Sequence, residues 1–296
     1  MLHAPPLVDF TPSSVHGSAL NPPTDLASIE GRSRDIRRAA LEMISASGAS
    51  HIGSVFSTAE ILATLYGGIL NVRPAEPDWP DRDRFVMSKG HAAAGLYAAL
   101  SLAGFFPQQR LKEFCVDGGS LPGHVTHRGI PGVDVSTGSL GHGLALAVGL
   151  AAGSRRLGAK WHVYALLSDG ECDEGSTWEA ALLAPAWRLS GLTAIVDYNK
   201  IQSLGRVDEV LPLEPFADKW RSFGWQVDEV DGHNIENLRQ RIDPTGWPSA
   251  GGPRCVIAHT IKGKGVSFME NDLLWHYRCP VGDEYDRAVT ELEVEG

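Results

Sequence analysis

The fold of this chain is decided by residues 161–205, WHVYALLSDGECDEGSTWEAALLAPAWRLSGLTAIVDYNKIQSLG. Two short apolar runs, 163–167 and 192–196, are separated by a segment with a helical pattern, 175–189. Two strand-like runs joined by a helix form a β-α-β unit, in which the strands are parallel and their carboxyl ends lie side by side. The sequence therefore predicts an α/β fold with a doubly wound, mostly parallel sheet flanked by helices.

Each of the two apolar runs ends in a polar side chain. Asp169 follows the first run and Asn199 follows the second, so both are expected at the edge where open α/β sheets bind ligands. A carboxylate and an amide offer oxygen ligands, which suit Mg²⁺ shared with phosphate groups. Gly170 lacks a Cβ and lets the backbone approach a phosphate closely. The pattern predicts a magnesium-diphosphate site, although an Asp-Gly dipeptide alone is typical of any surface turn.

The composition is that of a folded, acidic protein. The 296 residues are 43% hydrophobic, and 36 acidic against 26 basic residues give a net charge of −10, which argues against nucleic-acid binding. The four cysteines have no Cys-x-x-Cys spacing, so neither a zinc site nor a disulfide framework is indicated. No apolar run approaches the roughly 20 residues of a membrane span, and no leader pattern is present, so we expect a cytoplasmic protein.

The chain is expected to form a single domain, residues 28–296, after a proline-rich flexible arm, residues 1–27. The spacing of apolar residues predicts a first helix over 29–47 that stops at Gly48. Further elements are expected as strands at 81–87, 225–230 and 254–259 and as helices at 141–157, 216–223 and 235–242.

Two local patterns give more specific expectations. Ser57 and Glu60 have the spacing of a capping box and predict a helix that runs from there to about Leu70. Pro185 lies inside the helical segment of the β-α-β unit, where it removes a hydrogen bond and should kink the helix.

Two further segments have the chemistry of phosphate contacts. A glycine-rich passage contains STGSLGHG, residues 136–143, and precedes a helix whose free N–H groups favour an anion. Close packing by small residues explains the same glycines equally well. Lys264 in TIKGKG is a candidate phosphate contact, and a solvated lysine is the alternative.

The Asp-Gly turn, the acidic helix start, and the later Asn resemble the thiamine-diphosphate motif of the transketolase family. Four histidines match histidines that line the thiamine and sugar channel of that family, in the same order. They are His51 in ASHIGS, His91 in SKGHAAAGLY, His124 in LPGHV and His276 in LWHYR. The resemblance runs from about Ser28 to Leu292 and thus covers most of the sequence.

The resemblance implies a thiamine-diphosphate-binding fold, the cofactors thiamine diphosphate and Mg²⁺, and a set of site residues. The Mg²⁺ ligands would be Asp169, Asn199 and the carbonyl of Ile201. The residues at the cofactor would be His91, Gly138, Leu140, Asp169, Gly170, Glu171, Asn199 and His276. The catalytic histidines would be His51 and His124 at the sugar and His91 and His276 at the diphosphate. Glu174 matches a family residue at the subunit interface.

Five positions depart from the family pattern. Ser168 replaces the first glycine of Gly-Asp-Gly, which is tolerable if its φ is negative. His142 stands where Gln is usual. Ser50 and Ser54 replace residues that are commonly glycine, and Ile52 replaces a common proline, so the wall of the donor pocket is expected to differ.

In the family, the glutamate that activates the cofactor lies in a second domain. The residues after Gly205 are already needed to complete this sheet, so the chain resembles the amino-terminal subunit of a split, two-gene transketolase. Such an enzyme transfers a two-carbon ketol unit from a ketose phosphate to an aldehyde. The resemblance implies sugar phosphate substrates, a separately encoded carboxy-terminal partner that supplies the glutamate, an α2β2 heterotetramer, and no activity without the partner.

Other functions stay open at this point. On the same scaffold they are a specialised ketol or acyl transferase of a secondary pathway, a deoxyxylulose-phosphate synthase, and a 2-oxoacid dehydrogenase subunit. The four histidines favour a hydroxylated sugar over pyruvate, because buried hydroxyl groups need hydrogen-bond partners. The non-enzymatic alternative is a partner-binding half without cofactor, and Ser168 is its only support.

Overall fold

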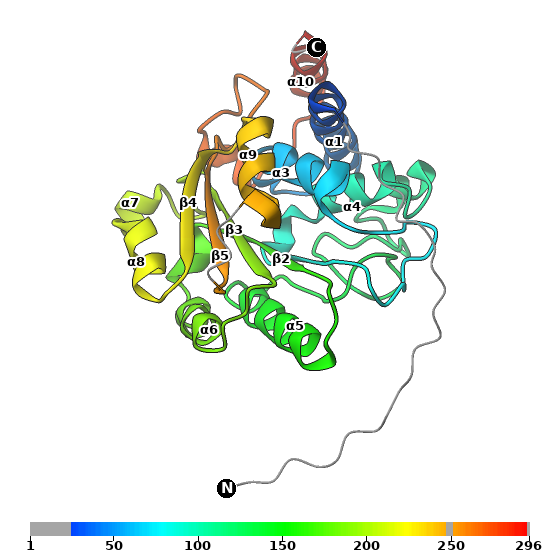
Figure 1. Cartoon of the computed structure of the whole chain (residues 1–296). Coiled ribbons are helices and arrows are strands. Elements are labelled where there is room, and N and C mark those ends of the chain that lie inside the picture. The colour runs from blue at the N-terminus through cyan, green and yellow to red at the C-terminus, as the bar shows by residue number, and fades with distance from the viewer. Residues whose placement is uncertain (1–24, 247–250, 295–296) are drawn as a thin grey trace, which may run out of the picture.

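The centre of the protein is a five-stranded sheet. The computed structural model describes residues 25–246 and 251–294. All the paired strands are parallel, in the order β1-β2-β3-β5-β4, and Figure 1 labels the last four of them. The strands are β1 Arg84–Met87, β2 Val163–Ser168, β3 Leu192–Tyr198, β4 Gln226–Asp231 and β5 Arg254–His259. The predicted β-α-β unit is confirmed, because β2 and β3 are neighbours and Ser168 pairs with Asp197 at their carboxyl ends.

Helices surround this sheet. The α-helices are α1 Leu26–Ser47, α2 Ile52–Phe56, α3 Ala59–Thr64, α4 Ala93–Leu102, α5 Gly143–Leu157, α6 Gly175–Ala186, α7 Val207–Val210, α8 Phe216–Ser222, α9 Ile235–Ile242 and α10 Asp283–Val294. The short helical turns are η1 Leu65–Ile69, η2 Gly90–Ala92, η3 Gln108–Glu113, η4 Gly170–Asp173, η5 Pro244–Gly246 and η6 Leu273–His276. Among the helices of the described residues, none is long and apolar enough to cross a membrane.

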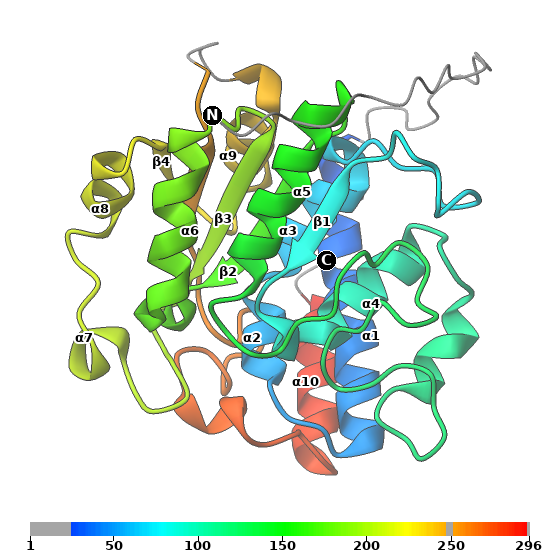
Figure 2. The same cartoon turned by 90° about the horizontal axis from the view of Figure 1, so that it is seen from below.

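The sheet is buried on both faces, which confirms the doubly wound architecture. Tyr164 and Leu166 of β2 point into a core shared with α1, α3, α4 and α9. Ala165 and Leu167 point into a second core shared with α5, α6 and α8. Figure 2 shows α5 and α6 lying across β2 and β3. Burial on both faces explains why β2 and β3 are continuous apolar runs rather than alternating ones.

The first helix agrees with its prediction. Asp25 caps α1 by accepting the Ser28 N–H at 2.9 Å, and the helix ends at Gly48, whose φ of 71° lies in the region that favours glycine. The predicted arm, residues 1–27, lies almost entirely outside the described residues, although its end already belongs to α1. The single-domain boundary at residue 28 stays a prediction.

The capping box predicted at Ser57 is wrong. The Ser57 hydroxyl donates to Asp197 Oδ2 at 2.7 Å, and Glu60 forms an ion pair with Arg37 at 2.7 Å. The following helix, α3, begins after Thr58 without any side-chain cap. The predicted single helix is divided instead into α2, α3 and η1, and Ser57 lies between the first two. Contacts with residues distant in the sequence therefore override the capping-box pattern.

Pro185 lies in the last turn of α6, one residue before the helix ends at Ala186. A proline at this position cannot donate to the carbonyl of Ala181. That carbonyl is satisfied from outside the helix, because the indole N–H of Trp225 donates to it at 2.7 Å. Trp225 is itself buried, so the proline and the tryptophan form a complementary pair.

This arrangement predicts a conditional loss of stability. Trp225→Phe should lower the free energy of unfolding by about 1–3 kcal/mol, because the Ala181 carbonyl is left buried without a donor. In a Pro185→Ala background the helix regains an N–H for that carbonyl, so the same change should cost less. Urea denaturation of the four proteins measures the coupling, and an equal loss in both backgrounds would contradict the assignment.

Candidate functional site

The carboxyl ends of β2 and β3 bring Asp169 and Asn199 together, as predicted. Asp169 is buried, and its Oδ1 and Oδ2 accept the N–H groups of Gly170 at 2.7 Å and Lys200 at 2.5 Å. Asn199 is also buried, and its Oδ1 accepts the Ile201 N–H at 3.2 Å. The loop after β3 therefore lies against the turn after β2, and the oxygen donors of both tips share one region of the edge.

The environment of the Asp169 carboxylate favours a cation beside it. Burial, reinforced by the negative charge of Asp197, raises the pKa of Asp169 to about 6, and a divalent ion beside the carboxylate would oppose this effect. Asp169, Asn199 and the Ile201 carbonyl form an oxygen-only donor set that fits Mg²⁺. Within the described residues, no group of three or more His, Cys, Asp or Glu side chains is arranged to hold a metal. Mg²⁺ does not need such a group, because phosphate and water oxygens commonly complete its shell.

Lys262 reaches the same edge from the loop after β5. Its Nζ donates to the Ile201 carbonyl at 2.8 Å and lies 3.0 Å from His276 Nδ1. Burial and the ammonium of Lys89 lower the pKa of Lys262 to about 8. A positive group therefore lies beside the predicted Mg²⁺ ligands, where a diphosphate would need one.

Behind the strand tips lies Asp197, a fully buried carboxylate. Lys89 Nζ and Thr260 Oγ1 donate to it, as do Ser57 Oγ at 2.7 Å and Asn199 Nδ2 at 3.0 Å. Although burial opposes the charge, the Lys89 ammonium holds the pKa of Asp197 below its usual value. Because Asp197 holds the amide nitrogen of Asn199, the amide oxygen turns toward the loop after β3. Asp197 thereby orients a predicted metal ligand.

Three charged residues of this edge were missed in the sequence: Lys89, Asp197 and Lys262. One signal was present, because a carboxylate within an apolar strand such as β3 requires a buried partner. The glycine-flanked TIKGKG motif directed attention to Lys264 instead. Lys264 pairs with Glu270 at 3.3 Å and is partly exposed, which agrees with the alternative of a solvated lysine.

The four predicted histidines form one cluster. The ring centroid of His51 lies 5.2 Å from that of His91, 5.8 Å from that of His124 and 4.9 Å from that of His276. Burial, followed by neighbouring positive groups, lowers the pKa of His51 to about 4 and of His276 to about 3, and it lowers the pKa of His91 well below its usual value. These three imidazoles are therefore neutral near pH 7, and each offers one donor and one acceptor.

The glycine-rich passage packs tightly over the end of β1. A Cβ on Gly90 would lie 2.6 Å from the Thr137 carbonyl, and a Cβ on Gly143 would lie 2.0 Å from Ser88 Oγ. Real Cβ atoms do not approach other atoms so closely, so only glycine fits at these two positions. Close packing therefore accounts for Gly143 of the passage and for Gly90 in the turn after β1.

Gly138 lies beside His124, since a Cβ there would lie 3.1 Å from the His124 Cδ2. Glu171, predicted to contact the cofactor, is fully buried, and its Oε1 accepts the Gly141 N–H at 2.9 Å and the Ser88 hydroxyl. Its carboxylate is thus used inside the protein. We interpret Glu171 as the tie between the turn after β2 and the loop that carries Gly138.

The departures from the family pattern have local explanations. Ser168 ends β2 with a negative φ, and its hydroxyl accepts the N–H of the third residue along at 3.2 Å. His142 is exposed at the start of α5, where its Nδ1 lies 3.1 Å from the Leu140 carbonyl. Ser50 Oγ lies 2.9 Å from His51 Nδ1, so this serine adds a polar group to the histidine cluster. Two departures are buried in α2: Ile52 and Ser54.

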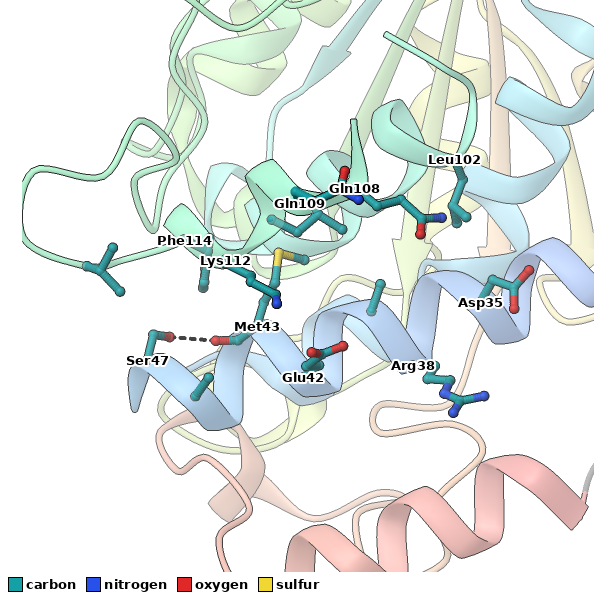
Figure 3. A pocket seen from close by; sticks show the side chains of 14 residues that line it. Asp35, Arg38, Glu42, Met43, Ser47, Leu102, Gln108, Gln109, Lys112 and Phe114 are labelled. Atoms are coloured by element: carbon teal, nitrogen blue, oxygen red, sulfur yellow. Dashed lines mark hydrogen bonds between the residues drawn. The ribbon is translucent and has the colours of Figure 1, made fainter. Parts of the chain in front are cut away.

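A groove of about 730 Å³ lies elsewhere, between α1 and the η3 region. Figure 3 shows Glu42 and Met43 of α1 facing Lys112 and Phe114 across it. None of the sequence-predicted site residues lines this groove. The candidate site is therefore the carboxyl edge of the sheet.

Curated proteins resemble the chain over nearly its whole length. A 6-deoxy-6-sulfo-D-fructose transketolase subunit from Clostridium sp. strain MSTE9 is 43% identical over 261 residues, which cover 88% of this chain and 94% of that protein. An apulose-4-phosphate transketolase subunit from Actinobacillus succinogenes is 40% identical over 271 residues, which cover 90% of this chain and 96% of that protein.

Solved transketolases share the fold. The enzyme from Campylobacter jejuni superposes with a TM-score of 0.84 at 28% identity, and that from Leishmania mexicana with 0.85 at 30% identity. Each match covers 91% of this chain but only 43% and 42% of the respective enzyme, so the chain spans less than half of their length. Residues 31–290 match the family described as "Transketolase, thiamine diphosphate binding domain". The chain therefore belongs to the transketolase family and corresponds to its thiamine diphosphate binding domain.

Proposed function

We propose that this chain is the amino-terminal subunit of a split transketolase, which transfers a two-carbon ketol unit from a ketose phosphate to an aldehyde acceptor. The observation that carries the proposal is the cluster of four imidazoles at the edge where Asp169 and Asn199 meet. The coverage of the two curated relatives supports one part of a divided enzyme rather than a whole enzyme.

The imidazole cluster supports a hydroxylated donor. Neutral His51, His91 and His276 present donors and acceptors in a partly dry site, and the hydroxyl groups of a ketose need such partners when they leave water. Each neutral imidazole also keeps one unprotonated ring nitrogen, which can accept a hydrogen bond from a substrate hydroxyl. Pyruvate has no hydroxyl groups to satisfy them. A ketose phosphate therefore fits the site better than a 2-oxoacid does.

We propose thiamine diphosphate and Mg²⁺ as the cofactors. Asp169, Asn199 and the Ile201 carbonyl would hold the ion, and the backbone at Gly170 with Lys262 would hold the diphosphate. The remaining contacts at the cofactor would come from His91, Gly138, Leu140 and His276. When bound, thiamine diphosphate supplies the carbon nucleophile. The protein fixes its position and surrounds it with neutral proton donors and acceptors.

We propose a cytoplasmic α2β2 heterotetramer with a separately encoded carboxy-terminal subunit that supplies the activating glutamate. The support on this chain is a set of exposed apolar side chains: Leu146 on α5, Leu182 on α6 and Trp187 directly after α6 are 40%, 58% and 44% exposed. Glu174 is exposed at the head of α6, as expected for an interface residue. Large exposed apolar groups on neighbouring helices are typical of an interface.

The metal assignment makes Asp169 indispensable for the cofactor. With the partner present, Asp169→Ala should weaken binding of magnesium thiamine diphosphate by more than the about 10–100-fold seen for outer-shell changes, because the ion loses its only charged protein ligand. Isothermal titration calorimetry measures the affinity. Asp173→Asn, which alters a carboxylate in the same turn, should retain binding. Retained affinity in Asp169→Ala would remove Asp169 from the site.

The donor assignment separates two of the histidines. His124→Ala should raise the KM for the ketose donor by about tenfold, as expected for a lost hydrogen bond to substrate, and leave cofactor affinity nearly unchanged. His91→Ala should impair both. Steady-state kinetics and calorimetry give the two quantities, and His127→Ala, an exposed neighbour bonded to Ser136, is the matched control. Turnover of pyruvate with release of carbon dioxide, and none of xylulose 5-phosphate, would show the donor assignment to be wrong.

The assembly proposal predicts that this chain has essentially no ketol-transfer activity alone and gains it with its partner. Leu182→Asp, on the exposed face of α6, should weaken assembly, because a charge would enter an apolar interface. Val116→Asp, at an exposed apolar position beside the groove between α1 and η3, should not. Mass photometry and a ketol-transfer assay decide the matter, and a fully active homodimer of this chain would refute the proposed heterotetramer.

A further inference from the structure

His233 lies in the turn after β4, outside the histidine cluster. Its Nδ1 lies 2.9 Å from Glu60 Oε2, and its Nε2 lies 2.8 Å from the backbone nitrogen of Ile261. A backbone N–H can only donate, so Nε2 must be the acceptor. The proton of the neutral ring is then on Nδ1 and is donated to Glu60. The two contacts fix both the tautomer and the orientation of this imidazole.

The Glu60 end of this contact is firmly anchored. Arg37 Nη2 of α1 pairs with Glu60 Oε2 of α3 at 2.7 Å and donates to the Phe56 carbonyl at 3.0 Å. The two paired side chains are only 3% and 9% exposed. Although burial alone would raise it, Arg37 and His233 lower the pKa of Glu60 to about 2. The carboxylate therefore stays ionised and remains an acceptor for the imidazole.

The Ile261 end leads directly to the candidate site. The next residue, Lys262, is fully buried and donates from Nζ to the Ile201 carbonyl at 2.8 Å. The same Nζ lies 3.0 Å from His276 Nδ1. The backbone position at Ile261 therefore determines where this ammonium emerges at the edge of the sheet.

We propose that His233 is a positioning residue. It links the Arg37–Glu60 pair to the backbone of Ile261 and so holds the Lys262 ammonium at the Ile201 carbonyl. The task requires a rigid group that donates at one end and accepts at the other, and a neutral imidazole is such a group. The effect on cofactor binding rests on the proposed function. The effect on the loop after β5 does not.

Two substitutions separate the two ends of the contact. Gln places an amide oxygen near the site of Nε2, so His233→Gln can still accept the Ile261 N–H while it loses Glu60. Asn places an amide nitrogen near the site of Nδ1, so His233→Asn keeps Glu60 and loses Ile261. The matched control is His259→Asn, which removes a solvent-exposed His–Glu pair with Glu229 on the neighbouring strands.

Amide hydrogen exchange on the full-length chain tests the loop directly. In His233→Asn, the peptide that spans 260–271 should exchange about five- to tenfold faster, the effect of losing one buried hydrogen bond. His233→Gln and His259→Asn should stay close to the wild type. Equal acceleration in the Asn and Gln variants, or none in either, would overturn the proposal.

A second measurement uses the wild-type chain and does not depend on the folding of His233→Asn. In protein labelled with ¹⁵N-histidine, with the signal assigned through His233→Gln, His233 should carry its proton on Nδ1 and leave Nε2 bare. The opposite tautomer, or a doubly protonated ring at pH 7, would overturn the proposal.

Cofactor binding then tests the consequence for the site. With the partner present, His233→Asn should bind magnesium thiamine diphosphate about five- to tenfold more weakly than the wild type, and His233→Gln should bind it nearly as well. Unchanged affinity in His233→Asn would refute the role at the site. Absence of binding in the wild type would refute the proposed function instead, while the exchange result would still decide the role of His233 in the loop.

Discussion

The carboxylate of Asp197 carries a negative charge at a position with no solvent exposure, and the carboxyl edge of the sheet is arranged around it. Its donors come from the turn after β1, the junction of α2 and α3, the end of β3 and the loop after β5. Leaving a buried charge without its partner costs about 3–5 kcal/mol. The need of this buried carboxylate for donors therefore holds the four segments together. The groups of the candidate site lie on the same segments.

Local periodicity was sufficient to predict much of the fold. The strand expected at 254–259 is β5, and the helix expected at 235–242 is α9, with the same limits. Apolar runs and helical spacing are properties of neighbouring residues, so they are visible in the chain. Ser57 shows the opposite case, because its hydroxyl bonds to Asp197, which is 140 residues away. Its local spacing gives no sign of that partner.

The candidate site was also predictable only in part from the sequence. Asp169 and Asn199 were predictable from the ends of two strands, because parallel neighbours end at one edge. The histidines required the family resemblance, since nothing in their local sequences brings them together. The inward direction of Glu171 was not predictable. It depends on the close packing of the loop at Gly141 against the turn after β2, which is a property of the assembled fold.

The aromatic residues on the α6 and α8 face have a consequence for observing this protein. The ring centroid of Trp220 lies 5.5 Å from that of Trp178 and 5.0 Å from that of Trp225, at interplanar angles of 47° and 84°. Indoles so close and so inclined couple their electronic transitions and produce a strong near-ultraviolet circular dichroism signal. Trp178 Nε1 donates to the Cys172 carbonyl at 2.8 Å. A shift of the turn that follows Asp169 would therefore move Trp178 and change this signal. The chain thus contains an intrinsic chromophore whose spectrum reports on the packing behind that turn.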